Sequence, residues 1–538
     1  MDKLTIKING HVLQGEKNES IMNVANRNRI DIIGLCYCKD IKPESSCRLC
    51  LVSIKGRKGL HTACNTKIEE GMEIETENEE IKKTRNTNFE LIFSKHCQNC
   101  ISCRRKNHCK ILDIAKKCDF DLKKKKSTFS TKMQFGPAIS FDSSKCINCN
   151  NCVQVCNNQG VGFLQKERID GFSKITTCKG KECVFCGQCL SHCPSGAFEE
   201  VSSIAEVKNI LGKKNNHVVF QFSSGMIMSL CKELGDRWDI SSFSRALKLL
   251  GADMVFDTSY AVDVIVEKES SAFISRAANN EKKCLFTSHC PAWVRYIKTY
   301  HPELNDCLSK NKSPHIICGA SIKNYLLKKG MKGENIYVIS IAPCTSKKFE
   351  ILGKSSFWGK YKSVDFSLTL SEMYTLLKDL DIEKVNEQDF KNVFIKSINP
   401  YNSNEDIVRM GIKLFYEKTM GSEAGGIEFK KISGIENGLE TEIISNGRKI
   451  RVGIVYGLGR AKKIVNDLKK DIGAYDYLEV MACPKGCLGG GGQTLGDLEE
   501  ISYSCGYFVG PQDNSLVKEI FTLTDEEFKK IGNTDGLD

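Results

Sequence analysis

The sequence predicts a large α/β domain with largely parallel sheets, preceded by small cysteine-rich α+β domains. Two observations predict this class. From about residue 209 onward, short β-type runs recur between helical stretches, which is typical of α/β folds with parallel strands. The expected strands cover residues 218–222, 254–257, 284–287, 336–341, 450–455 and 477–481. In the first third of the chain, 19 of the 28 cysteines fall between Cys36 and Cys193, among short apolar strands and turns.

Composition narrows the class of protein further. The 538 residues are 41% hydrophobic, which is ordinary for a globular protein. There is no run of about 18 apolar residues and no signal-peptide pattern at the N-terminus, so we expect a cytoplasmic protein with no membrane partner. Because thiols stay reduced in that compartment, the cysteine density indicates metal-bound thiolates rather than disulfides.

Composition shifts along the chain predict four domains. Residues 1–78 contain short strands at 4–8 and 51–54 between cysteine loops, and residues 79–126 are helical and end in a lysine run at 123–126. Residues 127–208 contain two similar cysteine runs, which indicates an internal duplication. Residues 209–538 form the α/β domain. The lysine run is either a docking face for an acidic electron carrier or a solvated basic surface.

The third domain contains two cysteine runs of identical spacing, which are the strongest signal in the sequence. The spacing is that of bacterial two-cluster ferredoxins, in which the fourth cysteine of each run ligates the other cluster. One predicted 4Fe-4S cluster therefore takes Cys146, Cys149, Cys152 and Cys193, and the other takes Cys183, Cys186, Cys189 and Cys156. The alternative, a pair of zinc ribbons, uses two Cys-x-x-Cys pairs per metal and fits this spacing poorly.

The first domain has the cysteines of a plant-type 2Fe-2S site, although the first gap is longer than the usual spacing. The expected ligands are Cys36, Cys47, Cys50 and Cys64, and Cys38 competes with Cys36.

The second domain offers one imidazole and three thiolates, which could hold zinc or an iron-sulfur cluster. These candidate ligands are His96, Cys100, Cys103 and Cys109, with Cys97 as a further candidate. The neighbouring clusters favour a 4Fe-4S cluster that relays electrons.

Three loops of the α/β domain carry cysteines directly after expected strands. Their candidate ligands are Cys290, Cys344, Cys483 and Cys487. Because ligands in α/β folds bind at the carboxyl ends of strands, four cysteines from three loops could converge on one cluster. The glycine run after Cys487 lacks the lysine and hydroxyl residue of a phosphate loop, so we interpret it as permitting close backbone approach to a bulky inorganic group. Lys347 could stabilise an anionic ligand.

Together these motifs resemble the iron-iron (FeFe) hydrogenases, and in domain order the large clostridial type with four accessory clusters. The resemblance covers essentially the whole chain and implies a two-lobed catalytic domain. It implies that the four loop cysteines hold the 4Fe-4S part of the active-site H-cluster. Cys487 would bridge to a diiron centre that carries CO, cyanide and azadithiolate. Lys347 matches a lysine that hydrogen-bonds a cyanide; Met481 and Glu350 match motif positions, and Ser224 is the closest match in the first βα loop.

The resemblance also implies the reaction and the partners. The family reversibly reduces protons to dihydrogen, with ferredoxin or a similar small electron carrier as the usual partner and maturation proteins that supply the diiron centre. The expected cofactors are one 2Fe-2S cluster, three accessory 4Fe-4S clusters and the H-cluster. Their thiolates would bring the formal charge of +12 close to balance, so no nucleic-acid partner is expected.

Several positions around the expected diiron pocket depart from the family pattern. His289 replaces a cysteine that is the innermost proton relay of the family; histidine can relay protons, but a packing substitution is equally compatible. Glu269, Ser309 and Arg276 match the outer proton route, whereas Ala272 replaces its second glutamate. Ala342, His315 and Thr494 also differ from the usual residues.

These departures keep two further functions open. The first is a dihydrogen sensor with low turnover. The second is a non-catalytic iron-sulfur electron-relay protein, although such a protein needs neither a bridging thiolate at position 487 nor a lysine that binds cyanide.

Overall fold

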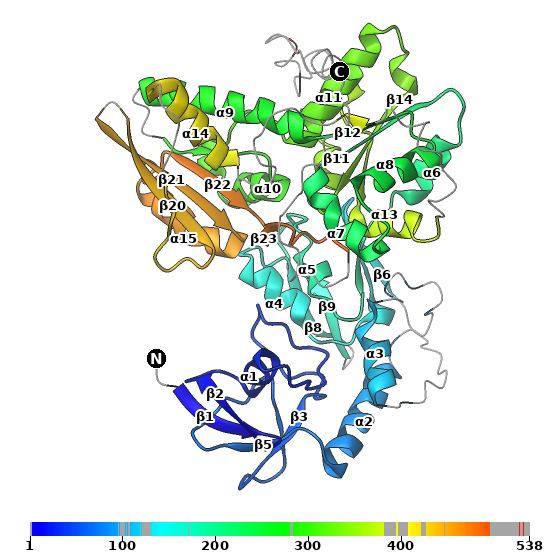
Figure 1. The fold of residues 1–538 in the computed structure, drawn as a ribbon, viewed down its shortest axis with the longest axis vertical. Coiled ribbons are helices and arrows are strands. Elements are labelled where there is room, and N and C mark those ends of the chain that lie inside the picture. The colour runs from blue at the N-terminus through cyan, green and yellow to red at the C-terminus, as the bar shows by residue number, and fades with distance from the viewer. Residues whose placement is uncertain are drawn as a thin grey trace.

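The computed structural model describes residues 3–94, 96, 100, 103, 105, 108–118, 120, 131–169, 172–279, 283–380, 394–395, 407–420, 427–445, 447–494, 527 and 531. Figure 1 shows one sheet at the N-terminal end, the segments around α4, α5, β8 and β9 in the middle, and two further sheets with their helices at the other end. The predicted fold class, an α/β domain preceded by small α+β domains, is confirmed. The lysine run at 123–126, Cys97 and Cys505 lie outside the described residues.

The N-terminal sheet has the strand order β2-β1-β5-β3-β4. Its strands are β1 (Lys3–Ile8), β2 (His11–Glu16), β3 (Leu51–Ile54), β4 (Leu60–Thr62) and β5 (Glu73–Glu75). Helix α1 (Ile21–Arg27) begins after Ser20, whose hydroxyl accepts the N–H of Asn23 and so caps the helix. Ile8 and Val52 of the sheet and Val24 of α1 belong to one buried core, which also includes Cys50 and Cys64.

The middle of the chain begins with the helices α2 (Glu79–Phe93) and α3 (Lys110–Lys117). The next elements are β6 (Lys132–Phe135), β7 (Ile139–Asp142), η2 (Ser143–Lys145), α4 (Asn151–Asn158), β8 (Leu164–Ile169), β9 (Phe172–Thr177), α5 (Gln188–Ser191) and β10 (Phe198–Glu200). The two cysteine loops follow the same backbone path: φ is 57° at both Asn148 and Phe185, and 68° at Asn150 against 73° at Gly187. The duplication inferred from spacing therefore extends to backbone geometry.

The first α/β sheet is entirely parallel, with the order β17-β14-β11-β12-β18. Its strands are β11 (His217–Phe222), β12 (Met254–Asp257), β14 (Ile336–Ala342), β17 (Phe366–Thr369) and β18 (Phe394–Ile395). The helices that follow these strands or lie near them are α6 (Ile204–Leu211), α7 (Ser224–Leu234), α8 (Ile240–Leu249), α9 (Ser259–Ala278), α11 (Pro314–Lys328), α12 (Ser346–Glu350) and α13 (Leu370–Leu377).

The second α/β sheet has the order β13-β22-β21-β20-β19, parallel from β13 to β21 and antiparallel beyond. Its strands are β13 (Leu285–Phe286), β19 (Lys430–Lys431), β20 (Gly438–Ser445), β21 (Arg448–Tyr456) and β22 (Tyr477–Met481), and β23 (Pro484–Cys487) follows β22. The remaining helices are α10 (Pro291–Tyr300), α14 (Ile407–Met420) and α15 (Leu458–Lys470). The two sheets are the two lobes expected from the sequence.

The cysteine loops lie where the lobes face each other. Cys290 follows β13 and directly precedes α10, whose first residue is Pro291, and Cys344 follows β14. Cys483 follows β22, and Cys487 ends β23. The parallel topology therefore brings the carboxyl ends of strands from both sheets to one region. None of the helices in the described part of the chain is long and apolar enough to cross a membrane.

Candidate active site and electron relay

Four cysteines from three loops meet between the lobes. The backbone N–H of Ala482 donates to the Cys290 sulfur at 3.4 Å, which joins two of the loops directly. The thiols of Cys344 and Cys290 are the strongest charged neighbours of both Cys483 and Cys487. Burial raises the pKa of Cys344 to about 11 and that of Cys487 to about 12. Free thiols here would keep their protons, so the positive charge of bound iron would be needed to stabilise four thiolates.

The glycine run packs against protein backbone rather than only facing a bound group. A Cβ atom on Gly490 would lie 2.0 Å from the carbonyl oxygen of Pro343, and one on Gly491 would lie 2.4 Å from the Cα of Gly187. Glycine is therefore required for the contact between the active-site loop and a cluster-binding loop, a role that our sequence interpretation did not include.

The same contact ties the active-site loops to the loop that carries Cys183, Cys186 and Cys189. The Thr345 hydroxyl donates to the carbonyl of Phe185 at 2.7 Å, and the side-chain amide of Gln188 donates to the carbonyl of Gly489 at 2.8 Å. The Ser346 hydroxyl donates to the carbonyl of Val184 at 3.3 Å. These bonds place a predicted relay cluster directly beside the active-site thiols, which is what electron transfer requires.

The two repeated cysteine runs exchange their fourth members. Cys193 interacts electrostatically with Cys146, Cys149 and Cys152, whereas Cys156 interacts with Cys183, Cys186 and Cys189. Each set of four lines its own small cavity. Backbone N–H groups of Ala197 and Phe163 donate to the sulfurs of Cys193 and Cys156, both at 3.2 Å. Among the described residues, no three His, Cys, Asp or Glu side chains are grouped closely enough to hold a single metal ion.

The N-terminal cysteines form two pairs. Cys36 and Cys47 are hydrogen-bonded to each other, as are Cys50 and Cys64, and all four are buried. The bond from Cys47 lowers the pKa of Cys36 to about 6, and the bond from Cys50 lowers the pKa of Cys64 to about 7. Cys38 takes part in neither pair; its sulfur accepts a hydrogen bond from Asn151 at 3.4 Å. Cys36, and not Cys38, therefore belongs to this group of four paired cysteines.

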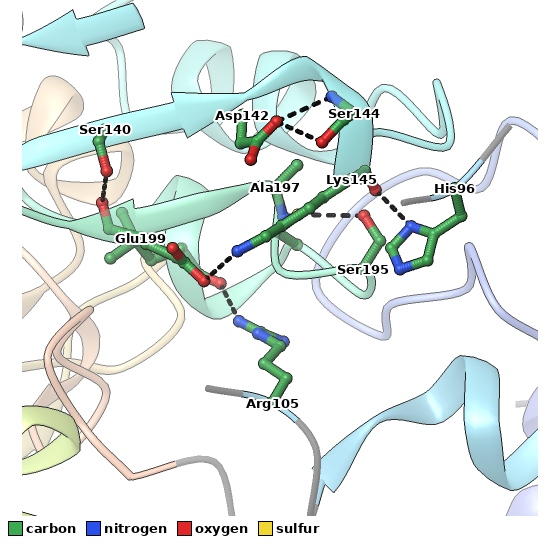
Figure 2. Close-up of polar contacts among 11 residues, drawn as sticks. His96, Arg105, Ser140, Asp142, Ser144, Lys145, Ser195, Ala197 and Glu199 are labelled. Atoms are coloured by element: carbon green, nitrogen blue, oxygen red, sulfur yellow. Dashed lines mark hydrogen bonds and ion pairs between the residues drawn. The ribbon is translucent and has the colours of Figure 1, made fainter. Parts of the chain in front are cut away.

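His96, a predicted ligand, contacts the backbone of Lys145 in the next domain. Its Nδ1 lies 3.0 Å from the backbone carbonyl oxygen of Lys145, so Nδ1 carries the proton. Figure 2 marks this contact with a dashed line. Burial lowers the pKa of His96, so the imidazole is neutral and Nε2 keeps a free lone pair. A metal-binding histidine commonly donates its other N–H to a backbone carbonyl in this way. Cys100, Cys103 and Cys109 are partly buried.

A cavity of about 1000 Å³ opens beside the four active-site thiols. Cys344, Cys487, Lys347, Met481 and His289 all line it. Ser223 lines it as well, whereas the neighbouring Ser224 donates its hydroxyl to the buried carboxylate of Asp257.

Lys347 is held at the cavity wall by a buried polar network. Its ammonium donates to Glu350 Oε2 at 2.8 Å and to the carbonyl of His289 at 3.2 Å. His315 Nε2 donates to the same oxygen of Glu350 at 2.8 Å, and its Nδ1 lies 3.1 Å from the Ser340 hydroxyl. Burial lowers the pKa of His315 to about 4; despite burial, Lys347 and His315 lower the pKa of Glu350 to about 2. The imidazole is therefore neutral and the carboxylate ionised.

The expected proton-transfer residues are partly connected. His289 Nε2 lies 2.9 Å from Oε1 of the fully buried Glu479, although the two atoms are not aligned for a hydrogen bond. Ser309 donates to Glu269 Oε1, and Tyr477 donates to Glu269 Oε2 at 3.3 Å. Burial raises the pKa of Glu269. Arg276 donates to the carbonyl of Cys284 at 3.3 Å.

Comparison with known families identifies the chain. The model of the iron-only hydrogenase large subunit, C-terminal domain, matches residues 216–491, just over half of the sequence. The chain belongs to this hydrogenase family. A 2Fe-2S cluster-binding domain matches residues 1–79, and a 4Fe-4S dicluster domain matches residues 145–197.

Curated relatives of this hydrogenase span most of its length. The NADP-reducing hydrogenase subunit HndD of Solidesulfovibrio fructosivorans is 29% identical over 93% of this chain and 90% of its own. Iron hydrogenase 1 of Clostridium pasteurianum is 28% identical over 92% of this chain and 90% of its own. A probable cytosolic Fe-S cluster assembly factor of Anopheles gambiae is 28% identical, over 58% of this chain and 71% of its own.

Two residues of the hydrogenase site escaped sequence reasoning. Glu479 and Tyr477 lie two positions apart on β22, so their side chains share one face of a buried strand. Polar residues alternating within an otherwise apolar strand are the signal that could have drawn attention to them.

Proposed function

We propose that this hydrogenase reversibly reduces protons to dihydrogen. It exchanges electrons with ferredoxin, or a similar small carrier, through one 2Fe-2S and three accessory 4Fe-4S clusters. The observation that carries the proposal is that Cys344, Cys487 and Lys347 line one cavity. Cys290 and Cys483 lie beside these thiols, and Thr345 bonds the adjacent cluster-binding loop. An electron carrier alone has no use for a cavity of this size beside its last cluster.

The donor set fits the H-cluster. Cys290, Cys344, Cys483 and Cys487 would hold it, and when bound it supplies the iron centre at which electrons and protons combine. Two of the three ammonium donors of Lys347 are used by Glu350 and the His289 carbonyl among the described residues, which leaves one N–H for a cyanide. Met481 lines the same cavity, and Ser224 holds the first βα loop through Asp257.

Protons would reach the cavity through buried polar side chains. His289 lies at the cavity wall, and the 2.9 Å between its Nε2 and the Glu479 carboxylate is within proton-transfer reach. Tyr477 donates to Glu269 and interacts electrostatically with Glu479, so the proposed route runs from Glu479 by way of Tyr477 to Glu269. From Glu269 the proposed route continues to Ser309 and then toward Arg276, with Ala272 interrupting the pattern of the family.

The decisive experiment loads the purified protein with the diiron cofactor in the presence of its maturation proteins. Infrared bands of bound CO and cyanide are expected, together with dihydrogen evolution from reduced methyl viologen. Absence of the bands would contradict every function that uses an H-cluster, including the sensor.

The dihydrogen sensor is the second candidate. The observations that favour it are the replacement of the innermost relay cysteine by His289 and the gap at Ala272. Infrared bands combined with negligible turnover would support the sensor over the enzyme.

A further inference from the structure

Lys348 is a buried lysine next to Lys347 on the short helix α12. Its ammonium lies 2.8 Å from Oε2 of Glu372, and the two side chains are 4% and 0% exposed. The same ammonium donates to the Ser203 hydroxyl at 3.3 Å. The ion pair therefore joins α12 to α13, and the hydroxyl joins both helices to the segment between β10 and α6.

The carboxylate of Glu372 is itself held by backbone N–H groups. Its Oε1 accepts the N–H of Ser203 at 2.7 Å, and its Oε2 accepts the N–H of Thr369 at 2.8 Å. The second bond is half of the capping box at the start of α13, in which the Thr369 hydroxyl accepts the N–H of Glu372 at 3.1 Å. The anchor for Lys348 is thus fixed by the main chain of two separate segments.

The two lysines leave α12 in different directions, because consecutive residues of an α-helix point about 100° apart. Lys347 lines the active-site cavity, whereas Lys348 reaches Glu372 and Ser203. A helix of only five residues has few hydrogen bonds of its own, so contacts with its surroundings determine how it is rotated about its axis. An anchor at Lys348 therefore constrains the direction in which Lys347 points.

The other side chains of α12 make a different connection. The Ser346 hydroxyl donates to the carbonyl of Val184, and the Phe349 ring lies 4.9 Å from the ring of Phe185. Both contacts are with the cluster-binding loop. Lys348 instead ties the helix to α13, which follows β17 of the first α/β sheet.

We propose that Lys348 is a positioning residue that orients Lys347 toward the cyanide of the diiron centre, with Glu372 and Ser203 as its anchor. Because the charges of Lys348 and Glu372 balance each other, the pair acts through the direction of Lys347 rather than through added charge at the cavity. The inference rests on the proposed function, in which Lys347 bonds a cyanide.

The test uses the full chain carrying its iron-sulfur clusters and the diiron cofactor, and it records the infrared bands of bound cyanide. In Lys348→Met the cyanide bands should shift, because Lys347 is held less firmly, and dihydrogen evolution should fall roughly tenfold. Lys348→Arg keeps a cation that can pair with Glu372, so its bands should lie closer to those of wild type. Ser203→Ala removes only the hydroxyl that Lys348 bonds, and its bands should shift in the same direction by a smaller amount.

Lys323→Met is the matched control for structural damage. Lys323 is also a buried lysine, 2% exposed and 2.8 Å from Asp365, but it lies on α11 and not on α12. Its loss leaves a carboxylate without its cation, so the unfolding temperature should fall while the cyanide bands stay in place. The double variant Lys348→Met/Glu372→Gln removes the carboxylate that Lys348→Met leaves unpaired. It should recover stability relative to Lys348→Met, whereas its cyanide bands should remain shifted.

Two results would overturn the inference. One is unmoved cyanide bands in Lys348→Met, or in Ser203→Ala if the methionine variant does not take up the cofactor. The other is an equal shift in Lys323→Met. Absence of cyanide bands from the loaded wild-type protein would instead contradict the proposed function itself.

Discussion

The relay half and the active-site half of the molecule build their metal sites in opposite ways. Six of the eight thiols of the paired clusters come from two short loops with matching φ angles, and backbone N–H groups stabilise sulfurs within the same loops. The active-site thiols come from three loops on two sheets, and the segment from Cys290 to Cys487 spans much of the catalytic domain. Relay sites can therefore form piece by piece, whereas the active site exists only when both lobes are in place.

The largest expected effect is the loss of active-site function while the relay clusters are retained. Cys487→Ser should abolish retention of the diiron centre and lower dihydrogen evolution by more than roughly a hundredfold, because even the loss of a residue that supports a ligand costs 10- to 100-fold. The paramagnetic signals of the three accessory 4Fe-4S clusters should remain.

Cys178→Ser is the matched control for this experiment, since Cys178 is partly buried and has no proposed ligand role. Loss of the accessory signals in Cys487→Ser would show that the two halves do not assemble independently.

A second variant removes a carboxylate of the proposed proton route and leaves the metal ligands unchanged. Glu269→Gln should lower turnover by roughly 100-fold or more, because it removes a buried carboxylate whose raised pKa suits proton transfer. Tyr477→Phe removes only the hydroxyl that donates to Glu269, so a loss of roughly tenfold or less is expected.

Infrared bands of CO and cyanide provide the control for both proton-supply variants, and their positions should match wild type. If Glu269→Gln retained full activity in both directions at several pH values, protons would have to enter by another route.

A smaller effect is expected at the network behind Lys347. His315→Gln removes the imidazole that bonds Glu350 and Ser340, so Glu350 should hold Lys347 less firmly. The cyanide bands should shift, and activity should fall by roughly tenfold. Ser340→Ala, which removes only the outer bond of the network, should produce the smaller shift of the two. Unchanged cyanide bands in His315→Gln would exclude this positioning role.

The features that could be predicted from the sequence also differ between local motifs and contacts across the fold. The cysteine spacings predicted that Cys156 and Cys193 are exchanged between the two cysteine runs. They also predicted which cysteines lie together in the structure, because each motif is local. The carboxylate next to His289 could not be predicted, since Glu479 lies 190 positions away and meets it only through the packing of β22 against the loop after β13. Our interpretation of the glycine run was incomplete for the same reason, because Gly187, which Gly491 contacts, belongs to another domain.

The smallest predicted effect concerns the join between two parts of the relay. The buried amide of Asn151 donates to the Cys38 sulfur at 3.4 Å and to the carbonyl of His192 at 3.3 Å, and so connects the 2Fe-2S domain to the paired-cluster domain. Asn151→Ala removes both bonds and should cost about 2 kcal/mol, at about 1 kcal/mol net for each bond. Because relay sites form piece by piece, the visible absorbance of the 2Fe-2S cluster should bleach at a lower temperature while dihydrogen evolution with methyl viologen changes less than about twofold. Asn88→Ala, which removes an exposed bond to the carbonyl of Arg48, should leave the bleaching temperature unchanged. Equal destabilisation of both halves in Asn151→Ala would mean that the relay and the catalytic lobes unfold as one unit.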